Sequence, residues 1–482
     1  MNGSSFIDTS GSLKAQVAKG AVWLYSLQGT QKAMTIVQMI ILARLLSPKD
    51  FGLIGIATIA MGTLEVFSIT GFSKALVQRQ DINNDFLNTA WTVAIIRGIV
   101  LFLILFFAAP LISGFFSVPE SLPIIQVLAL SFLLKGLRNI GVIYFSKKLE
   151  FHKTFIWQLS AFVAGFTVTI WLAIVLRDKW AIVWGMMATQ IVSAFGSYIV
   201  SGYRPRVHLN LQIAKGLFVY GKWILWSNIL VFLSRQGDKL FLTKFFGVVP
   251  LGTYTMATKF AEQPTVVNMV VQKILFPAYS SIQDNIERMR RIYLKVLSFV
   301  ALCAVPVMVG MMLLAKPFVF TVLGEKWSAA VVPMQILSIG ILVKSITGSS
   351  ASLFNAYGKP SANFYMTLVQ VCVLFISVIP LAAKFGINGV ALSFTLSCTG
   401  GIAVWLIALN RYLNIKPIEI MKVLLAPVCL TLVVILVIGC IIPYMLLDEL
   451  LQFMAVVLLA VSLYMAMVFA IHKLTRIKVL RY

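Results

Sequence analysis

The sequence Leu42-Ala-Arg-Leu-Leu-Ser-Pro-Lys-Asp-Phe-Gly52 joins the end of one long apolar stretch to the start of the next. A similar sequence, Leu242-Thr-Lys-Phe-Phe-Gly-Val-Val-Pro-Leu-Gly252, stands 200 residues later and keeps the basic residue and the final glycine. Other pairs follow the same spacing, or a spacing of 209 farther along: Trp23/Trp223, Ala57/Ala257, Thr58/Thr258, Gln126/Gln335, Lys135/Lys344 and Phe145/Phe354. Chance likeness between apolar helices is the alternative, but the shared basic residue and glycine around a short loop favour an internal repeat.

The composition around these stretches is that of a membrane protein. Of 482 residues, 60% are hydrophobic and 12% are charged, whereas a soluble domain has about 25% charged residues. Fourteen apolar segments are each long enough to cross about 30 Å of hydrocarbon as a helix. They are 20–43, 51–73, 87–109, 121–145, 154–176, 180–201, 217–245, 252–277, 293–315, 329–354, 362–383, 387–410, 419–443 and 451–471.

Basic residues in the loops predict the orientation of these segments. With the N-terminus in the cytoplasm, the cytoplasmic side holds 22 bases and the opposite side holds 8. The cytoplasmic group includes Arg204 and Arg206, and the outer group includes Arg44 and Lys49. This asymmetry predicts that both termini are cytoplasmic, in agreement with an even number of helices.

We therefore expect an all-α polytopic membrane protein of about 14 transmembrane helices. Each copy would contain six helices and form one lobe, residues 1–212 or residues 213–412. A pseudo-twofold axis along the membrane normal would relate the two lobes. Residues 413–482 would add two helices and a cytoplasmic tail. Transporters built in this way bind their substrate between the two halves.

Charged residues inside the apolar segments indicate what is carried. A charge at the bilayer centre costs about 3 kcal/mol or more, so buried cations are expected to line a wet cavity or to meet an anion. Only three acids fall inside the segments: Glu65, Asp238 and Glu262. Ten bases do so: Lys32, Arg97, Lys135, Arg138, Lys222, Arg235, Lys239, Lys259, Lys273 and Lys344.

Helical spacing then divides the bases. Lys222 and Lys273 lie near cytoplasmic ends and are expected to extend to the interface. Asp238 is expected to neutralise Arg235 or Lys239, Glu262 to neutralise Lys259, and Glu65 to satisfy one more cation. The remaining excess predicts an anionic substrate, because Arg and Lys suit phosphate. The predicted anion-binding residues are Arg97, Lys135, Arg138, Arg235, Lys344, Lys32, Lys239 and Lys259, and Lys135 and Lys344 would face each other across a shared cavity.

The same three acids are the only intramembrane groups suited to carry a coupling proton or sodium ion: Glu65, Asp238 and Glu262. A structural role as counter-ions is the alternative for each of them. Pro264, Pro306, Pro380 and Pro427 lie inside predicted spans, where they produce either bending points or static kinks.

Several kinds of function are disfavoured. The sequence has no Walker A, HExxH or GxSxG motif, so ATP bound to this chain is not expected to power transport. The five cysteines lie in apolar segments without CxxC or Cys/His spacing, and we expect no disulfide, metal or cofactor. The bases are scattered among apolar runs rather than gathered on a polar domain, which argues against binding of nucleic acid.

Four stretches resemble the Wzx-type polysaccharide translocases of the MOP (multidrug/oligosaccharidyl-lipid/polysaccharide) exporter superfamily. They are Val37–Gly52 (VQMIILARLLSPKDFG), Gly71–Ile82 (GFSKALVQRQDI), Leu275–Arg290 (LFPAYSSIQDNIERMR) and Val322–Leu337 (VLGEKWSAAVVPMQIL). The resemblance extends over nearly the whole chain. It is greatest to the branch that serves colanic acid, teichuronic acid and related exopolysaccharides. The matching stretches are loops and helix ends, so they indicate the family better than the substrate.

The resemblance implies a MOP/MATE-like fold and a flippase of the bacterial cytoplasmic (inner) membrane. Such proteins move undecaprenyl-pyrophosphate-linked oligosaccharide repeat units to the outer leaflet by alternating access, for exopolysaccharide or lipopolysaccharide biosynthesis. Expected partners are this lipid-linked oligosaccharide, membrane lipids, and the polysaccharide polymerase and export machinery. The lipid tail would stay in the bilayer, in a gap between helices or along a groove beside segments thirteen and fourteen.

Three alternatives remain. A drug/cation antiporter of the same superfamily would have an acidic site and usually twelve spans. A membrane polysaccharide polymerase or glycosyltransferase would have a large outer loop or a cytoplasmic catalytic domain. A structural scaffold would leave the buried cations unexplained.

Overall fold

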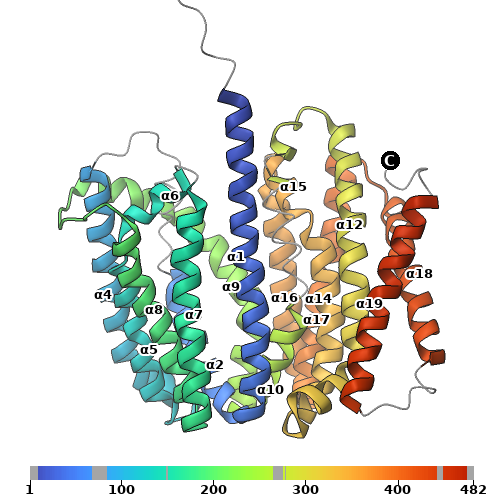
Figure 1. The fold of residues 1–482 in the computed structure, drawn as a ribbon, viewed down its shortest axis with the longest axis horizontal. Coiled ribbons are helices and arrows are strands. Elements are labelled where there is room, and N and C mark those ends of the chain that lie inside the picture. The colour runs from blue at the N-terminus through green and yellow to red at the C-terminus, as the bar shows by residue number, and fades with distance from the viewer. Residues whose placement is uncertain are drawn as a thin grey trace, which may run out of the picture. The chain divides into compact units, whose positions relative to one another are not determined.

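The computed structural model describes residues 9–67, 84–147, 150–263, 275–276, 278–441 and 449–474, and every regular element in these ranges is a helix (Figure 1). The chain divides into two units, Met1–Phe232 and Leu233–Tyr482, with the boundary inside helix α9 (Leu211–Phe246). The lobe limits drawn from the sequence stay a prediction.

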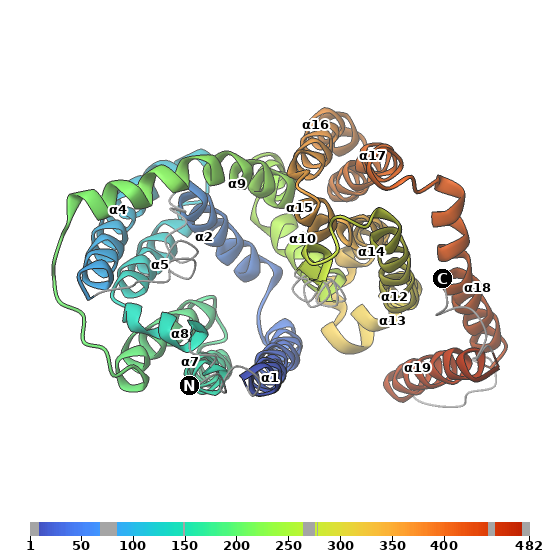
Figure 2. The same cartoon turned by 90° about the horizontal axis from the view of Figure 1, so that it is seen from above.

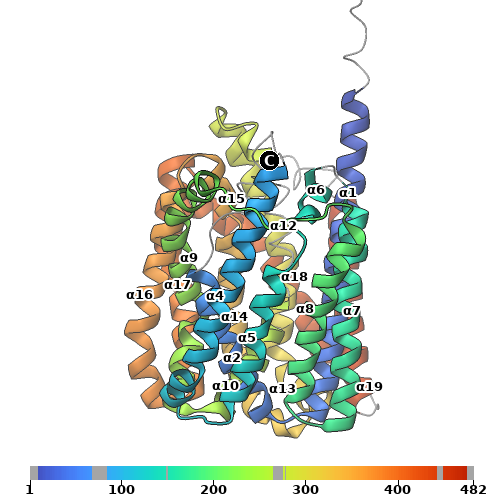
Figure 3. The same ribbon diagram turned by 90° about the vertical axis from the view of Figure 1, so that its left-hand side faces the viewer.

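Among its described residues, the first unit contains six helices of 16 residues or more and two short helices before α9. They are α1 (Thr9–Leu45), α2 (Pro48–Phe67), α4 (Asn84–Phe116), α5 (Ser121–Gly136), the short η1 (Ile140–Val142) and α6 (Ile143–Lys147), α7 (Phe151–Leu176) and α8 (Trp180–Val200). Helices α7 and α8 lie side by side along their lengths (Figure 3). Gly165 and Gly185 make this close packing possible, because a Cβ at Gly165 would lie 2.8 Å from the Gly185 carbonyl oxygen.

The second unit repeats this order after α9 and adds two helices. It contains α10 (Val248–Ala261), α12 (Ile286–Leu313), α13 (Ala315–Pro317), the π-helix η3 (Phe318–Leu323), η4 (Glu325–Ala330), α14 (Val331–Gly348), α15 (Ala351–Ala356), α16 (Pro360–Phe385), α17 (Ile387–Leu413), α18 (Pro417–Ile441) and α19 (Glu449–Leu474). Each of the fourteen predicted segments overlaps at least one helix of the described residues. In the described ranges, nine helical segments are long and apolar enough to cross a membrane.

The stretch around Ser47 forms a tight turn between α1 and α2. The Ser47 backbone N–H and hydroxyl both donate to Oδ2 of Asp50, at 2.9 and 2.6 Å, and the Asp50 N–H donates back to the Ser47 hydroxyl. This reciprocal capping starts α2, and Pro48 is suited to the first helical position. In the second copy Gly247, with φ +86°, occupies the equivalent turn between α9 and α10.

The packing of the helices also repeats. In the first unit α2 packs on α5, α5 on α8, and α7 on α8; in the second, α10 packs on α14, α14 on α17, and α16 on α17. Figure 2 shows α1 and α7 of the first unit and α12 of the second nearly end-on. The predicted single helices 121–145 and 329–354 are both interrupted, at Gly136 and Gly348, and each continues as a short helix that buries one of the paired residues Phe145 and Phe354. The internal repeat predicted from the sequence is therefore present in the fold.

The helices outside the repeat attach to α12. Leu430, Val434 and Ile438 of α18 form an apolar cluster with Val456 and Tyr464 of α19, and Leu302 and Leu314 pack against it. The Tyr464 hydroxyl donates a hydrogen bond to the Leu302 carbonyl oxygen at 2.9 Å.

Three of the four predicted intrahelical prolines are described. Pro306, Pro380 and Pro427 lie inside α12, α16 and α18. Pro110 inside α4 is a further proline within a helix and was not among those predicted. Pro264 lies outside the described residues.

Candidate functional site

Three basic side chains of the first unit gather around one carboxylate. Glu65 lies in α2, Arg97 lies within α4, Lys135 lies in the last turn of α5, and Arg138 follows that helix. Lys135 Nζ lies 2.9 Å from Oε1 and 3.2 Å from Oε2 of Glu65. The Glu65 charge also attracts the guanidinium groups of Arg97 and Arg138. We call these four residues the N-terminal cluster; within the part of the chain that the structure describes, it holds three bases and one acid.

Arg138 is held where the chain leaves α5. Its Nη2 donates a hydrogen bond to Oε1 of Gln190 in α8, at 2.6 Å. The next residue, Asn139, is fully buried, and its backbone N–H donates to the Ser197 hydroxyl at 2.9 Å. Because α8 binds both residues, the position of the guanidinium is fixed by the fold. Gln190 was not among the predicted site residues, although an amide within an apolar helix is a usable signal.

The loop that follows α8 also holds Asn139 in place. The Asn139 side-chain amide donates to the Tyr203 carbonyl oxygen at 2.7 Å. Burial raises the pKa of the Tyr203 hydroxyl, with Tyr144 and Asp85 adding to the effect. The hydroxyl therefore stays protonated, and it donates to Oδ1 of Asn88 at 2.5 Å.

A close crossing of α4 and α5 brings Arg97 and Lys135 together. Each residue stands next to a glycine at the crossing, Gly98 in α4 and Gly136 in α5. A Cβ at Gly98 would lie 2.7 Å from the Phe132 carbonyl oxygen, and a Cβ at Gly136 would lie 2.8 Å from that of Ala94. The two backbones touch because neither glycine has a side chain.

The second unit holds another group of charges, which we call the C-terminal cluster. Its members are Asp238, Lys239, Tyr254, Lys259, Glu262 and Lys344. Asp238 is 1% exposed, and its Oδ2 accepts a hydrogen bond from the Tyr254 hydroxyl at 2.6 Å. Its Oδ1 accepts the backbone N–H of Lys239 at 2.8 Å.

The predicted pairing of Asp238 is only partly met. Within the described residues no cation lies within the 4 Å of an ion pair with this carboxylate, while Lys239 and Lys344 attract it from farther away. Arg235 is exposed on α9 and is not among these neighbours. The Asp238–Tyr254 hydrogen bond joins two helices, and helical spacing alone does not reveal it.

The other lysines of the C-terminal cluster are differently placed. Lys344 Nζ lies 5.3 Å from the ring centroid of Phe394 in α17, a favourable position for a cation. Lys259 has an exposed side chain and interacts electrostatically with both Lys239 and Glu262. Charge of both signs is therefore distributed over three helices of this unit.

The remaining predicted site residues lie elsewhere. Lys32 lies on α1 and is partly exposed. The side chain of Lys222 and all of Lys273 lie outside the described residues. The anion-binding role of all these bases stays a prediction.

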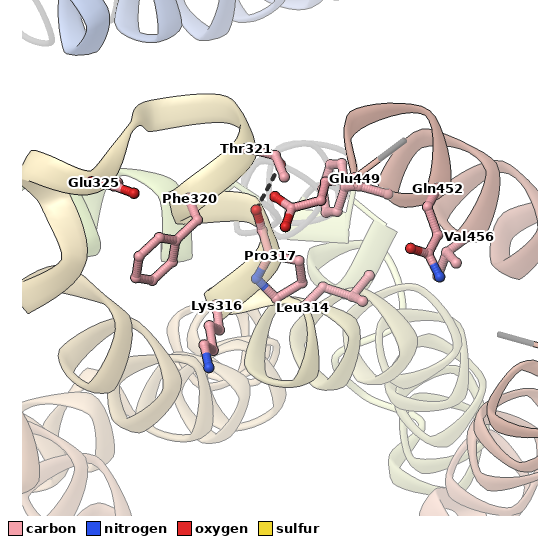
Figure 4. A pocket seen from close by; sticks show the side chains of 10 residues that line it. Leu314, Lys316, Pro317, Phe320, Thr321, Glu325, Glu449, Gln452 and Val456 are labelled. Carbon is pink, nitrogen blue, oxygen red and sulfur yellow. Dashed lines mark hydrogen bonds between the residues drawn. The ribbon is translucent and has the colours of Figure 1, made fainter. Parts of the chain in front are cut away.

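A separate cavity of about 520 Å³ lies within the second unit (Figure 4). The π-helix η3 and the start of α19 line it. Its charged residues are one base, Lys316, and two acids, Glu325 and Glu449. This mixed lining differs from the N-terminal cluster, where bases predominate.

Comparison of sequences relates this chain to a protein family and to individual relatives. Residues 41–332 match the family described as "Polysaccharide biosynthesis protein". The lipopolysaccharide biosynthesis protein WzxC of Escherichia coli (strain K12) is 28% identical over 411 residues, which cover 84% of this chain and 82% of that protein. The succinoglycan biosynthesis transport protein ExoT of Rhizobium meliloti (strain 1021) is 25% identical over 333 residues, which cover 68% and 67%.

Solved structures share the fold. The lipid II flippase MurJ in an inward closed conformation matches 94% of this chain and 100% of its own, with a TM-score of 0.75 and 13% identity. An inward-facing multidrug resistance MATE family transporter of the MOP superfamily matches 81% and 98%, with a TM-score of 0.63 and 15% identity. The chain therefore has the fold of MOP-superfamily transporters, as predicted.

Proposed function

This chain belongs to the family of polysaccharide biosynthesis proteins, and we propose that it is a flippase for lipid-linked oligosaccharides rather than an enzyme. Its substrate would be an undecaprenyl-pyrophosphate-linked repeat unit, moved from the cytoplasmic to the outer leaflet of the bacterial inner membrane. The product would supply exopolysaccharide or lipopolysaccharide synthesis. Both termini would lie in the cytoplasm.

One observation carries this proposal: the N-terminal cluster has three bases for one acid. Two guanidinium groups and an ammonium group suit the oxygens of a pyrophosphate, since each guanidinium offers two parallel N–H donors. The pyrophosphate is the part of such a lipid that apolar surroundings exclude most strongly. MurJ is a lipid II flippase and ExoT is a succinoglycan biosynthesis transport protein, and both support the same class of substrate.

The roles of the acids and of the C-terminal cluster belong to the same proposal. Glu65, Asp238 and Glu262 are the candidates for carrying a coupling ion. Glu65 is 44% exposed and Asp238 is almost fully buried, so Glu65 is the more accessible to ions from solution. The lysines of the C-terminal cluster, with Lys32 and Arg235, would contact the pyrophosphate or acidic sugars.

Translocation in proteoliposomes tests the proposal. Purified protein would be reconstituted with a defined undecaprenyl-pyrophosphate saccharide, and its movement between leaflets measured with and without an imposed ion gradient. We expect protein-dependent flipping that falls when the pyrophosphate is replaced by an uncharged linkage. Transport of organic cations without lipid flipping would instead identify a drug/cation antiporter.

A further inference from the structure

We propose that Glu65 competes with the substrate for the phosphate site. Its carboxylate pairs with the Lys135 ammonium group between transport events and leaves it when a phosphate-bearing lipid binds. This inference rests on the proposed function, and it names the residue that controls release from the N-terminal cluster.

The contact geometry supports this exchange. Both oxygens of Glu65 lie within hydrogen-bond distance of Lys135 Nζ, at 2.9 and 3.2 Å. A carboxylate and a phosphoryl group both present delocalised negative charge on adjacent oxygens, so the same cation binds either. Glu65 thus occupies a place suited to a phosphate oxygen.

The pair is also accessible. The side chains of Lys135 and Glu65 are 30% and 44% exposed, so a ligand can reach the ammonium group without unpacking the helices. A partly exposed ion pair of this kind contributes only about 0–1 kcal/mol. Such a pair can be exchanged at little cost, unlike a sealed one.

Charge makes the carboxylate the weaker of the two anions. Lys135 lies in the last turn of α5, where the helix terminus favours a cation, so its ammonium group stays charged for either partner. A pyrophosphate, with more charge and more acceptor oxygens, should displace the Glu65 carboxylate, whose return should help release the product.

Binding and transport of Glu65→Gln would separate this role from a structural one. The probe for binding is geranylgeranyl pyrophosphate in detergent, and flipping is measured in proteoliposomes. We expect Glu65→Gln to bind about threefold more tightly, because the competing charge is gone, yet to flip more slowly because release is impaired. Glu65→Asp should restore both values toward wild type, and Lys135→Gln should weaken binding.

Glu120→Gln provides a matched control. Glu120 pairs with Lys49 at 2.6 Å in the same unit, away from the cluster, and the hydrogen bond from Lys49 lowers the pKa of this exposed carboxyl. Its loss should change neither binding nor flipping. If folded Glu65→Gln protein binds the probe no more tightly than the wild type does, the exchange is overturned. Flipping by the wild type would still support the proposed function in that case. Absence of pyrophosphate binding and of flipping in the wild type would overturn both.

Discussion

At the residue scale, the donor geometry of each base determines how it would hold a pyrophosphate. Arg97 and Arg138 offer planar pairs of donors, and Gln190 fixes one guanidinium through its 2.6 Å hydrogen bond. A lysine keeps the charge but loses this geometry. The two arginines of the N-terminal cluster should therefore matter for both charge and orientation.

We expect Arg97→Gln and Arg138→Gln each to lower flipping by about tenfold, because a charge-assisted contact to the substrate is lost. The corresponding Lys variants should lie between Gln and wild type. Arg235→Gln tests the exposed arginine of the second unit in the same way. Flipping is measured in proteoliposomes per amount of monodisperse protein, and wild-type rates in all three Gln variants and in the triple variant would refute a cationic binding site.

The buried acid of the C-terminal cluster leads to a stability prediction. Tyr254→Phe removes the hydrogen bond to Asp238 between two almost fully buried side chains, and we expect it to lower the free energy of unfolding by about 1–3 kcal/mol. Thermal unfolding in detergent measures this. Tyr279→Phe is the matched control, because the Tyr279 hydroxyl is buried without a hydrogen-bond partner among the described residues. Equal losses for both variants would contradict the stabilising role of the Asp238 contact.

At the element scale, the packing of α4 against α5 positions the N-terminal cluster. Gly98→Ala places a methyl group 2.7 Å from the Phe132 carbonyl oxygen, so the helices must separate and Arg97 and Lys135 must move. We expect both the unfolding temperature and the flipping rate to fall.

Gly114→Ala serves as the control for the backbone effect of the substitution. Gly114 lies in the same helix with nothing within 4 Å of an added Cβ, and alanine is favoured over glycine there by about 0.5–1 kcal/mol. Its unfolding temperature should rise or stay constant while flipping continues. A Gly98→Ala protein that matches Gly114→Ala in both measurements would show that the close crossing is unimportant.

Hydropathy predicted the positions of the helices but not their interruptions. The apolar pattern continues through Ile140–Phe145, so the sequence predicted one helix where α5 ends at Gly136. The break depends on the hydrogen bonds of Asn139 to α8 and its loop, which are tertiary contacts. For the same reason Arg138 lies beyond the end of α5, where its hydrogen bond to Gln190 of α8 positions it.

The pairings of the acids were harder to predict than their presence. Counting charges gave the excess of bases and suggested that Glu65 meets one of them, and the structure contains the Glu65–Lys135 pair. Asp238 instead bonds to Tyr254, because a phenol sixteen residues away on α10 reaches it across the turn at Gly247. A repeat in the sequence indicated two copies of a helix bundle, yet it did not indicate that their charge clusters use different partners.

At the scale of the whole molecule, the distribution of basic loop residues predicts how the chain lies in the membrane. Because 22 loop bases lie on one side and 8 on the other, the side that carries Arg206 and Lys416 is predicted to be cytoplasmic. Single cysteines placed in a variant without the five native cysteines would report the side of each position. The positions are chosen in pairs, one from each unit, and all four native side chains are exposed: Arg206 and Lys416 on the inner side, Lys49 and Lys384 on the outer side.

In intact cells, a membrane-impermeant maleimide should label Lys49→Cys and Lys384→Cys and should leave Arg206→Cys and Lys416→Cys unlabelled until the membrane is permeabilised. Parallel copies of six helices require that the two positions of each pair behave alike. By the predicted segments, ten helices separate Lys49 from Lys384 and six separate Arg206 from Lys416, and an even number returns the chain to the same side. Reversed labelling of all four positions would invert the orientation but keep the repeat. Opposite labelling within a pair would mean that the copies are inverted, and the parallel arrangement drawn from the sequence would then be wrong.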